Sequence, residues 1–469
     1  MTTHQFDPTI LREYDIRGII DKTLTYKDAE FIGRAFGTMV ADAKGTSICV
    51  GYDGRLSSPN FERAVIDGIT ASGLTAIRIG LVPTPMLYYA VHKLPTDAGI
   101  MITGSHNPPE YNGFKFMMGK EPFFGKQIQQ LGIIAANCSL KTGLGNVQEQ
   151  NIHGSYVKRL MADYDGKRNL KLAWDSGNGA AGRVMADLCS RLPGQHILLN
   201  EEIDGNFPSH IPDPTLPAAL EQLRSVVLAE KCDFGIAFDG DGDRIGVIDD
   251  EGQILWGDQI LAIFASDILT HNPGAKIIAD VKASQGLFEE VERLGGKPIL
   301  CRTGHSFIKE KILKTKALLA GEMSGHIFFS DKYFGYDDAL YAAIRLLSLI
   351  SRKKTSLANI RKGLPKFVNT SELRFECNEA RKFGMVDEIL LRMRKKGVKI
   401  IDVDGLRVHT EDGWWLLRAS NTENALVARC EAKNNAGLSR LCGSLLRELR
   451  KSGLNPPELT NIKFTDIEV

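Results

Sequence analysis

The feature that most constrains the fold of this chain is the alternation of strand-like and helix-like segments over about its first 365 residues. The β-branched run at 47–55 ends in a glycine turn, and 61–73 follows with apolar residues at helical spacing. Similar rounds begin near residues 170, 234 and 275. Strands that alternate with helices predict parallel or mixed sheets covered by helices. In such sheets, active sites gather in the loops that follow the strands.

The last hundred residues follow a different pattern. Segment 364–379 is typical of a linker that enters an alternating strand, 401–432 of a meander of strands, and 438–453 of a helix. These features predict a separate, smaller α+β domain from about residue 366. At about 150 residues per domain, 469 residues suggest roughly three domains, give or take one. We therefore expect three α/β domains, at 1–150, 151–253 and 254–365, followed by an α+β domain at 366–469.

Composition argues against several classes of protein. The chain has 58 Lys and Arg against 57 Asp and Glu, a balance that does not indicate a nucleic-acid or membrane partner. No apolar run approaches the ~18 residues of a membrane span, and the first residues lack the apolar region of a signal peptide. The eight cysteines form no CxxC pair. We expect a cytoplasmic protein with reduced thiols, as a monomer or weak homodimer.

The segment DGDGDR, Asp239 to Arg244, places three carboxylates directly after an apolar strand. Carboxylates at this spacing repel each other, and the glycines between them let the backbone bend until all three face one centre. Asp239, Asp241 and Asp243 therefore predict a site for a hard cation such as Mg²⁺. An EF-hand loop does not fit, because Arg244 and Asp250 stand where that loop needs Gly and Glu. An exposed acidic turn without function is the remaining alternative.

The stretch TGSHNPPEYNGFK, residues 103–115, packs hydroxyl, imidazole and amide groups into one loop. It presents Ser105 and His106, with Lys115 close behind. The chain has no GxSxG elbow and no SxxK pattern in this loop, so acyl transfer finds no support there. With a metal site elsewhere in the chain, phosphoryl transfer through Ser105 is the better hypothesis, since that chemistry depends mainly on neutralising charge. An ordinary Asn-Pro turn is the alternative.

Four further loops combine charged groups with small residues. GEMSGH (321–326) offers acceptors and donors that suit the hydroxyls of a polyol. RASNTEN (418–424) joins a guanidinium to hydroxyls and an amide, which suits a phosphate. RTGHSFIK (302–309) and EYDIRG (13–18) are weaker signals taken alone. A satisfied polar turn is the alternative interpretation of each loop.

Taken together, these loops resemble the α-D-phosphohexomutases, and among them the phosphomannomutase/phosphoglucomutase branch. The resemblance runs from EYDIRG to RASNT, and the pair TGSHNPPEYNGFK and DGDGDR is its most specific part. It implies four domains around a central active-site cleft, each contributing one loop, with three similar α/β domains and a smaller fourth. It also implies that Ser105 is a phosphoserine, and that Asp239, Asp241 and Asp243 hold one Mg²⁺ per chain together with Ser105.

The resemblance assigns the other residues as well. Glu322 and Ser324 would bind the sugar hydroxyls. The phosphate already on the substrate would bind Arg418, Ser420, Asn421 and Thr422. Lys282, Thr303 and His305 would help to enclose the substrate. Charge stabilisation and proton transfer near the reacting oxygen would fall to Arg17, His106, Lys115, Arg244 and His326.

The implied reaction interconverts hexose 1-phosphates and hexose 6-phosphates of mannose and glucose. Phospho-Ser105 donates its phosphoryl group, a hexose 1,6-bisphosphate forms and turns over in the cleft, and the other phosphate returns to Ser105. Glucose 1,6-bisphosphate would be an activator. Met323 favours this branch, because phosphoglucosamine mutases, the main alternative, usually have Gln there. A sugar phosphatase needs no second phosphate site, and a catalytically inactive sensor would not need competent residues at every catalytic position.

Overall fold

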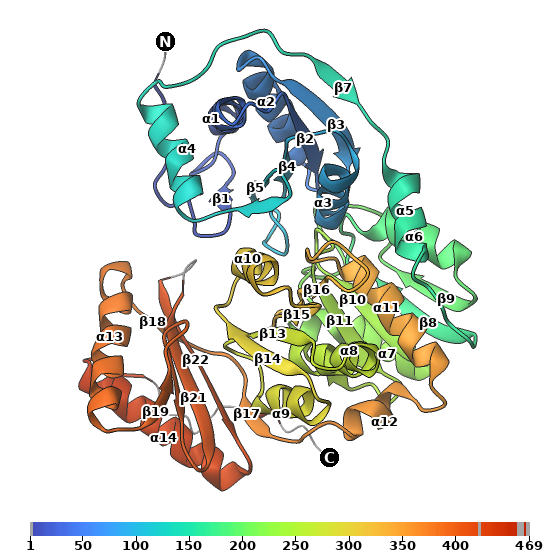
Figure 1. Cartoon of the computed structure of the whole chain (residues 1–469), viewed down its shortest axis with the longest axis vertical. Helices are drawn as coiled ribbons and strands as arrows, with labels where there is room; N and C mark the ends of the chain where they lie inside the picture. Colours follow the sequence, from blue (N-terminus) through green and yellow to red (C-terminus); the bar gives the residue numbers. More distant parts are fainter. Residues whose placement is uncertain (1–2, 421–423, 457–463, 466–469) are drawn as a thin grey trace.

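The computed structural model describes residues 3–420, 424–456 and 464–465. Within them, the strands form four sheets that follow one another along the chain (Figure 1). The first three sheets mix parallel and antiparallel pairs and are flanked by helices, whereas all strand pairs in the fourth are antiparallel. The predicted fold class is therefore confirmed.

The first sheet has the order β1-β5-β4-β2-β3-β7, with β6 beside β5. Its parallel centre joins β4, β2 and β3, and β5 closes it in antiparallel pairs with β4 and β1. The strands are β1 (Ile16–Ile19), β2 (Ser47–Tyr52), β3 (Thr75–Leu81), β4 (Ala98–Ile102), β5 (Tyr111–Met118), β6 (Glu121–Phe123) and β7 (Val147–Glu149). The helices are α1 (Tyr26–Asp42), α2 (Ser58–Ala71), α3 (Thr84–Lys93) and α4 (Lys126–Ala136). Helix α5 (His153–Met161) follows, and its buried residues belong to the core of the second and third sheets.

The second sheet has the order β12-β11-β10-β8-β9, in which β10 pairs in parallel with β8 and antiparallel with β11. Its strands are β8 (Leu170–Asp175), β9 (Gly194–Leu199), β10 (Phe234–Phe238), β11 (Ile245–Asp249) and β12 (Ile254–Leu255). The helices are α6 (Gly182–Arg191), the 3-10 turn η1 (Pro217–Leu220) and α7 (Glu221–Ala229). The acidic segment thus lies in the tight turn between the buried strands β10 and β11.

The third sheet has the order β14-β13-β15-β16. Its strands are β13 (Lys276–Asp280), β14 (Lys297–Cys301), β15 (Leu319–Gly321) and β16 (Ile327–Phe329). The helices are α8 (Gly257–His271), α9 (Gln285–Arg293), α10 (His305–Thr315), α11 (Ala339–Arg352) and α12 (Leu357–Lys362). Helix α11 is buried along almost its whole length, because it packs between the second and third sheets and against α5.

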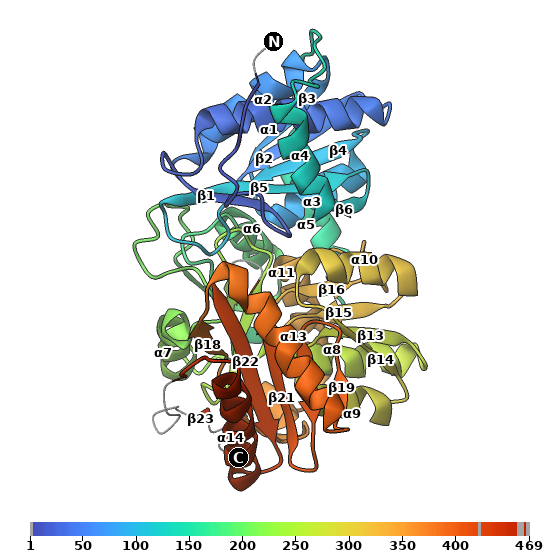
Figure 2. The same cartoon turned by 90° about the vertical axis from the view of Figure 1, so that its left-hand side faces the viewer.

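The fourth sheet has the order β19-β20-β21-β22-β17-β23, with β18 also beside β22. Its strands are β17 (Val368–Thr370), β18 (Leu373–Glu376), β19 (Lys399–Ile401), β20 (Leu406–His409), β21 (Gly413–Ala419), β22 (Ala425–Ala432) and β23 (Phe464–Thr465). Helices α13 (Glu379–Lys395) and α14 (Asn435–Lys451) lie over the same face of the sheet (Figure 2).

The buried apolar residues show which parts of the molecule share a core. One cluster joins the second and third sheets to α3 of the first, and a second fills the rest of the first sheet. The fourth sheet has a core of its own, to which Trp415 and Leu417 of β21 point. Their neighbours Trp414 and Leu416 face the other way and pack on Val281, directly after β13, as the two-residue period of a strand requires.

In the described part of the chain, no helix combines the length and apolar character needed to cross a membrane.

Candidate active site

A cavity of about 730 Å³ collects side chains from all four sheet regions. The loops that line it follow β4, β13, β14 and β15, so the site lies at the carboxyl ends of these strands, as expected for such sheets. Of the residues predicted from the sequence, the cavity is lined by Arg17, Ser105, His106, Lys115, Arg244, Lys282, Thr303, His305, Glu322, Ser324, His326, Arg418 and Ser420. Asn421 and Thr422 lie outside the described residues.

Ser105 has a strained backbone at the base of this cavity. Its φ is +50°, in the left-handed region that residues other than glycine rarely adopt. Its N–H donates to Thr103 Oγ1 at 2.8 Å, and its Oγ donates to Asp239 Oδ2 at 2.9 Å. Partly buried His106 has Nδ1 3.1 Å from the same Oγ. The left-handed turn therefore directs the hydroxyl at the acidic loop.

The turn between β10 and β11 brings the three aspartates together, all fully buried. Asp239 Oδ1 accepts the N–H groups of Asp243 and Arg244, at 3.0 and 3.1 Å, which holds the turn closed. Gly240 lies against the serine loop, since a Cβ there would approach Ser105 O to 2.4 Å. Glycine at this position thus permits contact between two loops from different sheets.

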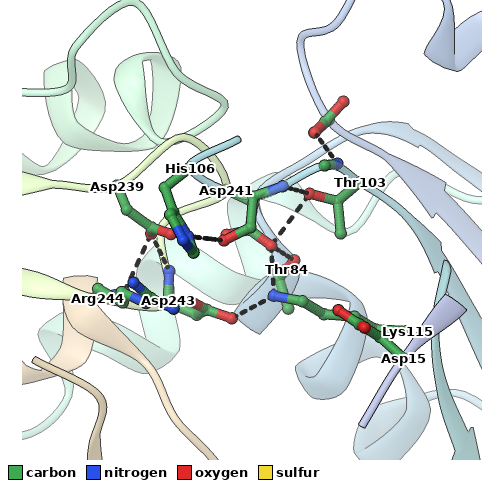
Figure 3. A network of polar contacts seen from close by, with 12 residues as sticks. Asp15, Thr84, Thr103, His106, Lys115, Asp239, Asp241, Asp243 and Arg244 are labelled. Atoms are coloured by element: carbon green, nitrogen blue, oxygen red, sulfur yellow. Dashed lines mark hydrogen bonds and ion pairs between the residues drawn. The ribbon is translucent and has the colours of Figure 1, made fainter. Parts of the chain in front are cut away.

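Lys115 of β5 supplies the positive charge nearest to these carboxylates (Figure 3). Its Nζ lies 2.7 Å from Asp241 Oδ2 and 2.6 Å from Asp243 Oδ2. Thr84 and Thr103 donate to Asp241 Oδ2 as well. Burial would raise the pKa of Asp241, but Lys115 holds it below its usual value. Burial and Asp241 together raise the pKa of both Asp239 and Asp243, so one lysine leaves the cluster short of positive charge.

The same cluster has free coordination positions for a cation. Asp241 Oδ1 and Asp243 Oδ1 are buried and have no hydrogen-bond partner among the described residues. One oxygen from each of Asp239, Asp241 and Asp243 lies within 4.8 Å of the others. Buried carboxylate oxygens without partners are unfavourable unless a cation binds them. The residues present therefore fit a divalent cation with oxygen ligands, such as Mg²⁺.

The loop between β15 and β16 forms another wall of the cavity. Glu322 Oε1 accepts the N–H of Gly304 at 3.1 Å, and Ser324 Oγ donates to Glu322 Oε2 at 3.0 Å. This loop also contacts the second sheet, because Ile245 N–H donates to Gly325 O at 3.0 Å. Glu322 and Ser324 thus have fixed positions from which to meet hydroxyl groups.

His326 lies between a cation and a carboxylate. Its Nε2 accepts from Arg244 Nε at 3.1 Å, and its Nδ1 lies 3.0 Å from Asp337 Oδ2. Asp337 Oδ1 also pairs with Lys309 Nζ at 3.0 Å, and Asp337 Oδ2 lies 3.9 Å from His305 Nδ1. Burial would raise the pKa of Asp337, but Lys309 and the two histidines hold this pKa well below its usual value. Sequence reasoning missed Asp337, which a tertiary contact alone brings to His326.

The opposite end of the cavity is rich in cations. Arg418 Nε donates to Asp404 Oδ2 at 2.9 Å, which leaves its two terminal nitrogens for another acceptor or further contacts. Lys282 Nζ lies 3.2 Å from Glu372 Oε2, and this lysine lowers the pKa of Glu372 to about 2. Arg429 lines the same end. Neither Glu372 nor Arg429 was predicted from the sequence.

Two predicted loops meet across the cavity. Tyr14, two residues before Ile16, donates its OH to Thr303 O at 2.8 Å and leaves no space for a side chain at Gly304. Arg17 pairs with Asp15 and donates to Asn107 Oδ1 beside the serine loop. The weak EYDIRG and RTGHSFIK signals therefore belong to one site.

Four family models match this chain in consecutive segments. All are named phosphoglucomutase/phosphomannomutase: alpha/beta/alpha domain I at residues 8–135, domain II at 154–252, domain III at 256–367, and the C-terminal domain at 372–448. The chain therefore belongs to the phosphoglucomutase/phosphomannomutase family.

Individual relatives are similar over nearly the whole chain. A phosphomannomutase/phosphoglucomutase of Pseudomonas syringae pv. tomato is 41% identical over 94% of this chain and 95% of its own length. A phosphoglucomutase of Neisseria meningitidis is 42% identical over 92% and 95%. The crystal structure of a phosphoglucomutase/phosphomannomutase family protein from Burkholderia thailandensis superimposes with a TM-score of 0.92 at 40% identity, covering 97% of this chain and all of that one.

Proposed function

We propose that this protein is an isomerase that interconverts hexose 1-phosphates and hexose 6-phosphates, with mannose and glucose phosphates as substrates. The observation that carries the proposal is the position of Ser105. Ser105 lines the cavity together with Arg418 and Lys282, and its Oγ donates to Asp239 of the buried triaspartate cluster behind it. A mutase needs both a phosphoryl carrier and a second phosphate site, whereas a phosphatase needs only the first.

The reaction proceeds through a phosphoryl group on Ser105. The substrate's own phosphate binds Arg418 and Ser420, together with Asn421 and Thr422, and its free hydroxyl faces Ser105. The phosphoryl group passes to that hydroxyl, so the bond from Ser105 Oγ to phosphorus breaks and a bond from the sugar oxygen forms. The resulting hexose 1,6-bisphosphate reorients in the cavity, so that its two phosphates exchange places. Its other phosphoryl group then passes to Ser105 Oγ, so the bond from that phosphorus to the sugar oxygen breaks and the freed oxygen takes up a proton.

This chain's own side chains supply position and charge for that transfer. Asp239, Asp241 and Asp243 would hold one Mg²⁺ with an oxygen of the serine, and the ion would stabilise the negative charge that the transferred group carries. We assign the proton of the attacking hydroxyl, and the remaining charge stabilisation, to the cationic and imidazole groups around Ser105. These groups are Arg17, His106, Lys115, Arg244 and His326.

Recognition of the sugar is assigned to the opposite wall. Glu322 and Ser324 would bind two of its hydroxyls, while Lys282, Thr303 and His305 enclose it. Within the proposed division of the chain, residues 1–150 carry the phosphoserine loop and 151–253 the metal loop. Residues 254–365 carry the sugar loop and 366–469 the phosphate loop. Activation by glucose 1,6-bisphosphate, a monomeric or weakly dimeric state and a cytoplasmic location stay predictions.

A coupled assay for glucose 6-phosphate tests the proposal. The protein receives Mg²⁺, a trace of glucose 1,6-bisphosphate, and either glucose 1-phosphate or mannose 1-phosphate with the matching coupling enzymes. We expect turnover with the wild type and a loss of orders of magnitude in Ser105→Ala. Turnover only with glucosamine phosphates would instead assign a phosphoglucosamine mutase, and release of free phosphate would assign a phosphatase.

A further inference from the structure

A buried arginine that the mechanism above does not use touches the loop that carries Ser105. Arg55 follows β2 in the sequence Asp53-Gly54-Arg55, and its side chain has no solvent exposure. A guanidinium has five N–H groups in a rigid, planar fork. A fully buried guanidinium is unfavourable unless these groups find acceptors.

All five N–H groups of Arg55 find acceptors, four of them in the serine loop. Four of them donate to backbone carbonyls, at 2.8 Å for Ser105, 2.5 Å for Asn107, 2.6 Å for Pro108 and 3.0 Å for Tyr111. The fifth, on Nε, donates to Asp53 Oδ2 at 3.2 Å. Asp53 Oδ2 also accepts the N–H of Gly104 at 3.1 Å. The Asp53–Arg55 pair therefore holds the backbone both before and after Ser105.

The packing around this pair leaves the loop little freedom. A Cβ added to Gly104 would approach Arg55 Nε to 2.4 Å, so the loop backbone lies directly on the guanidinium. On another side, the ring of Phe207 lies 5.2 Å from Arg55 Cζ. The guanidinium is thus enclosed between the serine loop and a segment of the second domain.

We propose that Arg55, together with Asp53, is a positioning residue for phosphoryl transfer. The pair holds Ser105 in its left-handed conformation, and this conformation directs Oγ to Asp239. A misplacement of about 1 Å in such a site costs about 10²-fold in rate. The inference rests on the proposed function, since it concerns the same serine and the same reaction.

Arg55→Lys separates positioning from simple burial of charge. Lysine keeps the charge and most of the length, but its single ammonium cannot reach four carbonyls arranged around a planar fork. Arg407→Lys is the matched control. Arg407 is equally buried and also donates to backbone carbonyls, at 3.0 Å each for Val281 and Ala283, but these flank Lys282 at the other end of the cavity.

The experiment measures kcat, KM, thermal unfolding and hydrogen–deuterium exchange for wild type and both variants. For Arg55→Lys we expect kcat to fall about 10²-fold, KM to change less than about threefold, and exchange to accelerate in residues 103–111. For Arg407→Lys we expect KM to rise while kcat stays near the wild-type value. If Arg55→Lys does not fold, Asp53→Asn takes its place in the test. We then expect the same changes, a lower kcat and faster exchange in residues 103–111.

The outcomes distinguish the two proposals. A folded Arg55→Lys, or a folded Asp53→Asn in its place, with wild-type kcat and unchanged loop exchange would overturn the positioning role. So would equal kcat losses in Arg55→Lys and Arg407→Lys at equal losses of melting temperature, because that result describes general destabilisation. Absence of mutase turnover in the wild type would instead overturn the proposed function, whatever the exchange data show.

Discussion

The two ends of the cavity are built differently. At the transfer end, Ser105 and the aspartates belong to sheets that pack closely, since α3 of the first sheet shares one core with the second and third. The buried Arg55 there has an acceptor for every N–H. At the recognition end, the fourth sheet keeps its own core and meets the third through a small apolar contact around Trp414.

The buried arginine at the recognition end, Arg407, is less completely paired than Arg55. Arg407 Nε and Nη2 and Glu431 Oε2 are buried, and none of these atoms has a hydrogen-bond partner within the described ranges. The guanidinium lies 3.7 Å from the ring centre of Trp414 instead. The fold therefore fixes the position of Ser105 relative to the aspartates and leaves the fourth sheet more weakly attached. Substitutions at the first end should change kcat, and those at the second should change KM.

Of the substitutions that compare the two ends, Asp241→Asn at the transfer end should have the largest effect. It removes one carboxylate charge from the proposed metal site, so we expect kcat to fall about 10²- to 10³-fold and Mn²⁺ binding to weaken about 10- to 100-fold. Kinetics and a direct Mn²⁺ titration measure the two effects. Asp42→Asn, in an exposed pair with Lys141, makes the same change of charge and should leave both unchanged. Normal Mn²⁺ affinity in Asp241→Asn would mean that Asp241 is not a metal ligand.

Arg418→Lys at the recognition end should have the next largest effect. Arg418 keeps two terminal nitrogens for a phosphate after its bond to Asp404, and lysine cannot reproduce that fork. Loss of a charged hydrogen bond predicts a KM about 10-fold higher, with kcat within about threefold. Steady-state kinetics measure both constants. Arg440→Lys, in an exposed pair with Asp412, is the control. A lower kcat at unchanged KM would contradict the division between the two ends.

Glu372→Gln should have the smallest effect. The carboxylate of Glu372 pairs with Lys282 Nζ at 3.2 Å. Replacing this carboxylate by a neutral amide should free the lysine to bind phosphate and should therefore lower KM. The folded-state pKa of Glu372, about 2, lies below its usual 4.5. The ion pair therefore stabilises the fold above about pH 4.5 and loses this contribution as the pH falls toward 2. The pKa shift limits the contribution of this ion pair to the free energy of unfolding to about 3 kcal/mol. Solvent screening reduces that contribution to about 1 kcal/mol.

Thermal unfolding at several pH values measures this contribution. The difference in melting temperature between wild type and Glu372→Gln should be largest near neutral pH and should narrow below pH 4.5. Asp402→Asn, in an exposed pair with Arg394, provides the comparison within the same domain. A difference that stays constant with pH would mean that the ion pair does not stabilise the folded state.

The sequence predicted the parts of the site that lie within single loops. DGDGDR and the serine loop carry their chemistry in a few consecutive residues, and the strand–helix alternation placed both after strands. Residues that meet only in the folded chain gave no such signal. Thr84 reaches Asp241 across 157 positions, and Asp337 approaches His326 from beyond β16. A lone threonine or aspartate is compatible with many environments, so the tertiary fold alone identifies its partner.

Arg55 illustrates the same limit. The sequence predicted a β-branched run at 47–55 that ends in a glycine turn, and the structure has β2 there with the turn directly after it. Nothing local indicated that its arginine would bind four carbonyls of a loop about 50 residues away. Hydrogen bonds to backbone carbonyls depend on the path of the chain and not on residue type, so they leave no pattern in the sequence.

The most direct test of the central claim follows one phosphoryl group. The protein is incubated with labelled glucose 1,6-bisphosphate, the labelled peptide is identified by mass spectrometry, and unlabelled glucose 1-phosphate is then added. We predict label on Ser105 that passes to sugar phosphates when glucose 1-phosphate arrives, and no stable label in Ser105→Ala. Label on another residue, or label that leaves Ser105 only as free phosphate, would contradict the account.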